Sequence, residues 1–203
     1  MQTRPRLLVL LAAIVLVTTT ACSQAAPDPG ASDTPSAPTS SATPSASVEP
    51  ADATIELPET CEDAFSVALR DRLAAEQLPL NDPTLTMPST DVTAGQELLE
   101  TVAHLRCSWG VASEVGIATE IALIDAAQAT ALQTALAADG LTCASVEGDD
   151  QQTRCTREES FEGEMAGKIG EIHVFKGNAW ISTKWINVDM AGYADDMVAT
   201  LWA

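Results

Sequence analysis

The chain has 203 residues, a net charge of −19 and only 4% aromatic residues, all of which lie after residue 60. So acidic a chain repels phosphate backbones and anionic lipid headgroups, which argues against nucleic acid as a partner and against contact of the folded part with a lipid surface. The length and the position of the aromatic residues predict one folded domain toward the C-terminus.

Residues 1–22 have the three parts of a secretory signal peptide. Arg4 and Arg6 form the charged start, residues 7–17 (LLVLLAAIVLV) are an unbroken apolar run, and small residues lead to Cys22. An apolar run of this length is too short to span a bilayer as a stable helix. The segment therefore predicts export from the cytoplasm.

The end of this leader, Thr19-Thr20-Ala21-Cys22, resembles the lipobox of bacterial lipoproteins. The resemblance implies a diacylglyceryl group on Cys22, with palmitate among its acyl chains, and a location on the outer face of the cytoplasmic membrane. Two acyl chains anchor a protein firmly, whereas one anchors it only marginally. Thr19 stands where leucine is usual, so plain secretion after cleavage near Ala21 is the alternative.

Residues 23–54 form a linker of Ala, Ser, Thr and Pro that has no Lys, Arg or aromatic residue. Such a segment cannot bury enough apolar surface to offset the entropy lost on ordering, so we expect it to be disordered. Its prolines favour extended conformations, which gives a reach on the order of 100 Å at most. The linker thus separates the anchor from a single domain at residues 55–203.

Four cysteines follow Cys22, at positions 61, 107, 143 and 155. An even number in an exported domain predicts two disulfides, for which three connectivities are open. We favour Cys61–Cys107 and Cys143–Cys155, because sequential pairing ties a helix to a strand through the first pair and closes one hairpin-like loop through the second. The spacing is not that of a zinc site, and we expect neither a metal nor a cofactor.

Helices and strands follow from the apolar spacing and the capping residues. A first helix begins at Thr60, and Asp125 caps a third, Ala-rich helix that ends at Gly140. The other expected elements are a short helix at 97–103, strands at 105–112 and 116–124, a cysteine-bearing stretch at 142–158, a loop at 161–170, a hairpin at 171–188 and a terminal helix after Asp189. This order predicts an α+β fold, with an antiparallel sheet and helices packed mainly on one face.

The layout resembles small actinobacterial lipoproteins of unknown function. The shared features are the lipobox Cys22, the Ser/Pro-rich linker, Cys61 near the start of the first helix and the Cys-x-Trp motif Cys107-Ser108-Trp109. The resemblance implies a similar fold and the Cys61–Cys107 bridge. It implies no activity.

The turn signal Gly177-Asn178 defines the register of the hairpin at 171–188. One face then reads as core and carries Ile172, Val174, Ala179, Ile181 and Trp185. The other is a candidate binding face, which we expect to be partly exposed and which carries Phe175, Trp180, His173, Ser182, Glu171 and Lys184. The alternative is cross-strand pairing that only stabilises a sheet.

No hydrolase, zinc-protease, P-loop or dinucleotide motif is present, and we expect no enzyme activity. Ser182, His173 and Glu171 resemble a triad in composition, but neighbours on a flat hairpin lack a cleft and oxyanion donors. The acidic residues at 147, 149 and 150 lack the alternating spacing that wraps Ca²⁺.

We therefore expect a lipid-anchored module of the cell envelope that binds a ligand or partner at the hairpin face or in a groove between sheet and helix. Its expected partners are the membrane, through the lipid, and a cell-envelope protein or a small hydrophobic or cell-wall ligand. The alternatives are a structural or accessory envelope protein without a small ligand, and a hydrolase with an unrecognised site.

Overall fold

The computed structural model describes residues 54–163 and 166–203. The expected signal peptide, the lipidation site Cys22 and linker residues 23–53 lie outside the described residues. Among the described residues, none of the helices has the length and apolar character needed to cross a membrane.

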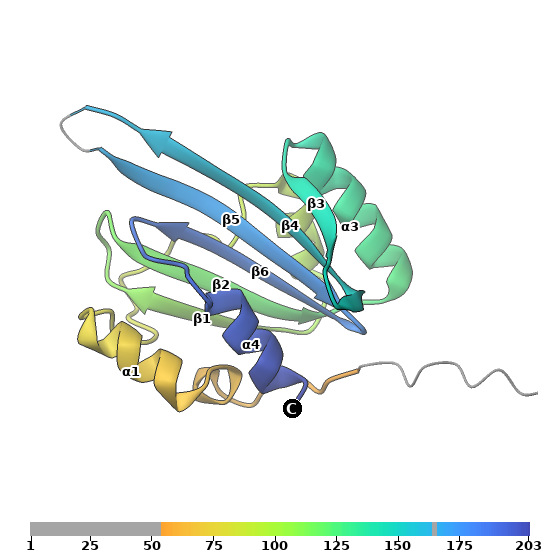
Figure 1. The fold of residues 1–203 in the computed structure, drawn as a ribbon, viewed down its shortest axis with the longest axis horizontal. Coiled ribbons are helices and arrows are strands. Elements are labelled where there is room, and N and C mark those ends of the chain that lie inside the picture. Colours follow the sequence, from red (N-terminus) through yellow and green to blue (C-terminus); the bar gives the residue numbers. More distant parts are fainter. Residues whose placement is uncertain (1–53, 164–165) are drawn as a thin grey trace, which may run out of the picture. The chain divides into compact units, whose positions relative to one another are not determined.

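Six antiparallel strands form one sheet in the order β1-β2-β6-β5-β4-β3 (Figure 1). The strands are β1 (His104–Gly110), β2 (Gly116–Leu123), β3 (Thr142–Val146), β4 (Asp149–Phe161), β5 (Gly167–Lys176) and β6 (Ala179–Ile186). The predicted α+β class with an antiparallel sheet is confirmed. The expected loop at 161–170 is shorter than predicted, because β4 continues to Phe161 and β5 begins at Gly167.

The hairpin formed by β5 and β6 has the predicted register. Phe175 pairs with Trp180, and His173 pairs with Ser182. Gly177 at the turn has a φ of 55°, a conformation that suits glycine. A two-residue turn with this chemistry fixes which side chains share a face, so the alternation along both strands could be read from the sequence.

In the described part of the chain four α-helices pack around the sheet: α1 (Val67–Ala75), α2 (Thr93–Leu99), α3 (Ala126–Ala138) and α4 (Tyr193–Leu201). The single helix expected from Thr60 is divided in two, because Phe65 is extended between a 3-10 turn, η1 (Cys61–Ala64), and α1. The Ser66 side chain accepts a hydrogen bond from the Leu69 backbone N–H and so caps α1. The predicted cap of α3 is confirmed, since Asp125 and Gln128 form a reciprocal capping box.

The helices cover both faces of the sheet rather than mainly one. On the first face η1, α1 and α4 pack against the apolar residues expected as core, which include Val174, Ile181 and Trp185. On the second face α2 and α3 pack against Phe175 and Trp180. The division follows from the strands themselves, because β5 and β6 carry large apolar residues on both sides and each set requires cover.

Both predicted disulfides are confirmed. Cys61–Cys107 joins η1 to β1, and Cys143–Cys155 joins β3 to β4 at directly paired positions. The first bridge fixes the start of the helical layer to one edge strand of the sheet. The second fixes the other edge strand to its neighbour, so both edges of the sheet are covalently held.

Candidate functional site

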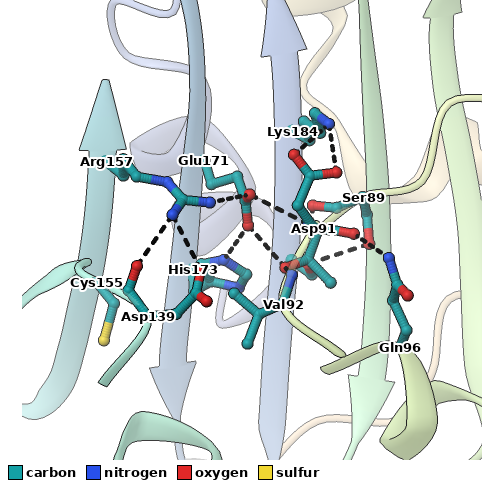
Figure 2. Close-up of polar contacts among 12 residues, drawn as sticks. Ser89, Asp91, Val92, Gln96, Asp139, Cys155, Arg157, Glu171, His173 and Lys184 are labelled. Atoms are coloured by element: carbon teal, nitrogen blue, oxygen red, sulfur yellow. Dashed lines mark hydrogen bonds and ion pairs between the residues drawn. The ribbon is translucent and has the colours of Figure 1, made fainter. Parts of the chain in front are cut away.

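The candidate binding face of the hairpin is buried, and the expectation that it is partly exposed is wrong. Trp180, His173 and Ser182 are 0% exposed, and Glu171 is 2% exposed. Phe175 and Lys184 are buried as well. The cover comes from α2 and from residues 79–92, a segment that we call the strap (Figure 2).

The strap begins at the edge of the sheet and ends at α2. Leu80 bridges to Trp109 of β1, and further along the strap Ser89 and Thr90 are fully buried against the second face. Its three prolines at 79, 83 and 88 disfavour regular helix, so the segment is irregular, with a turn at Asp82–Leu85, and it reaches across several strands. Gly95 of α2 completes the cover, because a Cβ at this position would lie 3.2 Å from the Trp180 ring.

The Glu171 carboxylate is the centre of the polar contacts under the strap. It accepts hydrogen bonds from the Thr90 hydroxyl at 2.7 Å, the Asp91 backbone N–H at 3.1 Å and the Arg157 guanidinium at 2.9 Å. His173 Nε2 lies 3.1 Å from the same carboxylate. Burial alone would raise the pKa of Glu171, but the hydrogen bonds from His173, Thr90 and Asp91 outweigh it and lower the pKa to about 2.

His173 is held as the neutral tautomer with its proton on Nε2. The Trp180 indole N–H donates to His173 Nδ1 at 3.2 Å, so Nδ1 must accept and Nε2 must donate to Glu171. Burial lowers the pKa of His173, which outweighs the opposing effect of Glu171. The charge of Glu171 is therefore balanced by Arg157 rather than by the histidine.

Ser182 does not pair with His173, although the two are cross-strand neighbours. The Ser182 hydroxyl donates to the Ser89 carbonyl at 3.0 Å, and both ring nitrogens of His173 are bonded elsewhere. The nucleophile–base contact that a serine hydrolase requires is therefore not assembled from these residues. His104 is exposed, with its Nδ1 atom 3.1 Å from the Val102 carbonyl oxygen.

The charged residues at the margin of the strap are engaged as well. Lys184 donates to both carboxylate oxygens of Asp91 at 2.5 Å, and Arg157 also bonds the Asp139 carboxylate at 2.9 Å. A cavity of about 90 Å³ lies among Asp91, Arg157 and Lys184. It is too small for most ligands, and the surrounding charges already have partners. The Lys184–Asp91 contact attaches the strap to β6, and the Arg157–Asp139 contact attaches the end of α3 to β4.

An open groove lies on the first face, where no helix is seen in front of β4 and β5 (Figure 1). We call it the first-face groove; its volume is about 500 Å³. Its lining combines apolar, polar and charged residues from four strands and from the loops before β3 and α4: Gly140, Thr142, Thr156, Arg157, Glu158, Glu171, Ile172, Trp185 and Met190. This volume lies in the range of sites for small molecules.

Trp185 is the largest residue in the lining of this groove. It is 4% exposed, and its buried indole N–H has no hydrogen-bond partner among the described residues. Gly170 lies opposite on β5, and a Cβ there would come within 2.7 Å of the Trp185 ring. The absence of a side chain at Gly170 therefore lets the indole pack closely against β5.

From the sequence we expected a groove between sheet and helix as one possible binding place, but we assigned Trp185 and Ile172 to the core and named no residues for such a groove. Thr142, Thr156 and Glu158 reach it because β3 and β4 follow β5 in the sheet, an order that no local motif specifies. The alternation of Thr156 and Glu158 along one side of β4 was the available signal, since it places a polar row on one face.

A second open groove, of about 540 Å³, runs beside α1. Val67, Leu78, Leu80 and Trp109 make its lining mainly apolar, and Val67 is 63% exposed. The charged residues Glu62, Arg70 and Asp71 line the same groove, so it offers an apolar contact area with charges beside it to a protein partner.

Metal binding has no support from clustered ligands. Within residues 54–163 and 166–203, no group of three or more His, Cys, Asp or Glu side chains is placed to hold a metal ion. Asp149, one of the acidic residues of the β3–β4 turn region, accepts a hydrogen bond from Lys176 at 2.6 Å.

Comparison with protein-family models, curated proteins and solved structures finds no match for this chain.

Proposed function

We propose that this chain is an extracytoplasmic lipoprotein, anchored through Cys22, whose folded domain is a binding module of the cell envelope. The leader and the Thr19-Thr20-Ala21-Cys22 box support export and anchoring. The two disulfides suit an oxidising compartment outside the cytoplasm. The linker lets the domain work at a distance from the membrane that holds it.

The first-face groove is the observation that carries the binding role. The second face is filled by the strap, α2 and α3, so it is occupied by the fold itself. The first face stays open beside Met190, and the groove there presents hydroxyls, a carboxylate and apolar surface together. Convergent polar groups within a partly apolar hollow are typical of ligand sites.

A thermal-shift screen of the mature protein tests this role. The ligands are uncharged saccharides, anionic saccharides, aliphatic alcohols and short peptides, each at millimolar concentration. A ligand that binds the folded state raises the melting temperature. The variant Thr156→Tyr fills the groove and should abolish the shift, whereas Thr130→Tyr on exposed α3 should retain it. A shift that survives Thr156→Tyr, or no shift with any class, contradicts a binding role for the groove.

An accessory role through a protein partner is the second candidate, and the exposure of Val67 favours it. The apolar groove beside α1 would be buried in such a complex. Val67→Glu should then release the partner from the anchored protein while the melting temperature stays unchanged. A partner retained by Val67→Glu would exclude this surface.

A further inference from the structure

We propose that the first-face groove takes an uncharged, hydroxyl-bearing ligand of the size of one or two sugar units. The inference rests on the proposed binding role of the groove and adds the chemical class of its ligand. It depends on three properties of the lining: an unsatisfied donor, a set of oxygen acceptors beside apolar surface, and the absence of an unpaired cation to receive an acid.

The unsatisfied donor is the indole N–H of Trp185. The side chain is 4% exposed, and its Nε1 atom has no partner in the part of the chain that the structure describes. Buried polar groups in folded proteins nearly always have a partner, and an exception requires an explanation. Because an indole N–H can only donate, the matching ligand atom is an acceptor such as a hydroxyl or amide carbonyl oxygen. The Nε1 atom is enclosed in the structure, so this acceptor reaches it when the side chains of the lining shift on binding.

The acceptors are Glu158, Thr142 and Thr156. One carboxylate oxygen of Glu158 accepts from Lys168 at 2.7 Å, which leaves lone pairs for a second donor. The threonine hydroxyls donate or accept according to the ligand. Ile172 and Met190 lie beside them and are only partly buried. A sugar ring matches this lining, because its hydroxyls lie at the rim and its C–H groups form an apolar face.

The cations at the groove already have acidic partners, so an anionic ligand finds no unpaired counter-charge among them. Arg154 and Lys168 lie on this face, and their ammonium or guanidinium groups are paired with Asp195 at 2.6 Å and with Glu158 at 2.7 Å. Arg157 directs its guanidinium to Glu171 and Asp139 under the strap. The chain as a whole carries a net charge of −19, which repels anions at longer range.

NMR of the indole N–H groups tests the ligand class directly. The uniformly ¹⁵N-labelled mature protein is titrated separately with chitobiose, a di-hexuronic acid and decanol. Trp185→Phe identifies the Trp185 signal by its loss, and the variant keeps an aromatic ring of similar position. We expect chitobiose to shift the Trp185 indole signal saturably, while the indole signal of Trp180, which is buried on the second face, stays in place.

Each outcome has a distinct consequence. A saturable shift of Trp185 with chitobiose alone supports the ligand class. A shift with the di-hexuronic acid or decanol but not with chitobiose overturns the ligand class and leaves the proposed binding role standing. If none of the three ligands shifts the Trp185 signal, the ligand class is overturned. If, in addition, no ligand in the thermal-shift screen raises the melting temperature, the binding role is overturned as well.

Two further variants separate contact from loss of fold. Trp185→Phe should weaken chitobiose binding about three- to tenfold, the loss expected for one hydrogen bond. Glu158→Gln should weaken it by a similar factor. Glu159→Gln is the matched control, since Glu159 is the next residue of β4 and faces the opposite side of the sheet. Equal affinity for the Glu158 and Glu159 variants would contradict the contact.

Discussion

Thr90 and Glu171 lie 81 positions apart in the sequence, and the Thr90 hydroxyl donates a 2.7 Å hydrogen bond to the buried Glu171 carboxylate. This contact joins the strap to the centre of the sheet. The Asp91 backbone N–H, Arg157 and His173 donate the other hydrogen bonds to the carboxylate. The hairpin face that we expected to bind a ligand is therefore a buried contact between the strap and the sheet.

Thr90→Val should destabilise the domain by about 1.5–3 kcal/mol, the cost of removing a hydrogen bond to a buried charged group. Valine keeps the shape of threonine, so the loss reflects the missing hydroxyl. Urea unfolding of the mature protein measures it. Thr93→Val on exposed α2 is the control and should change the stability by less than about 0.5 kcal/mol. Equal effects of the two variants would contradict the role assigned to Thr90.

Stability should fall as the pH is lowered, through two groups on the second face. Glu171 has a folded-state pKa of about 2, below its ordinary value of 4.5, so its contribution is present above pH 4.5 and is lost between 4.5 and 2. His173 has a folded-state pKa below 6.5, so its unfolded form takes up a proton first and stability declines below pH 6.5. Chemical unfolding at a series of pH values measures both.

The variant Glu171→Gln isolates the first of these effects. Between pH 4.5 and 2 the unfolded wild-type protein binds up to about one more proton at Glu171 than the folded protein does. The variant lacks this difference, so its free energy of unfolding should vary less with pH in that window. The variant will also be less stable at neutral pH, because Arg157 loses its buried partner. An unchanged slope between pH 4.5 and 2 would show that Glu171 is not the titrating group.

Gly95→Leu should displace α2 from the second face. A Cβ at this position would meet the Thr90 methyl group at 3.0 Å and the Trp180 ring at 3.2 Å, and the rest of the leucine has no space. Overpacking costs about 1–3 kcal/mol, from which the roughly 1 kcal/mol gained by replacing glycine in a helix is subtracted. Thr93→Leu, on the exposed side of the same helix, should be neutral. A more stable Gly95→Leu would contradict the close contact.

Removing the disulfides should have unequal effects. The chain-entropy model assigns about 4 kcal/mol to Cys61–Cys107, which closes 46 residues of sequence separation, and about 3 kcal/mol to Cys143–Cys155, which closes 12. Double cysteine-to-alanine variants of each pair, compared by urea unfolding, measure the two values. A larger loss from the Cys143–Cys155 pair would show that strand contacts, rather than loop closure, dominate its effect.

The hairpin at 171–188 could be predicted because its information is local. Gly177-Asn178 sets the turn, and the period of two then places each side chain. Whether the face with His173 is exposed depends on the strap, which lies more than 80 residues upstream and carries no regular periodicity. Ser89, Thr90 and Gly95 fix the position of the strap and α2 on the sheet. They do so through contacts with distant residues, which the sequence of the strap alone does not reveal.

The first-face groove escaped prediction for a related reason. Trp185 lies on the side of the hairpin that the alternation of side chains predicts as core, and it is buried as expected. What makes it part of a groove is the arrangement of β3 and β4 beyond β5, together with Met190 from the loop before α4. Strand order depends on pairing between segments far apart in the sequence, whereas the alternation of side chains between the two faces is local to each strand.

Export and anchoring through Cys22 underlie every role proposed for the domain. Intact-mass and peptide mass spectrometry of the protein isolated from its native membrane tests them most directly. We predict a mature chain that begins at Cys22, carries a diacylglyceryl group and contains Cys61–Cys107 and Cys143–Cys155 as disulfides. A chain that retains Met1 and carries no lipid, with all five cysteines as reduced thiols, would contradict them.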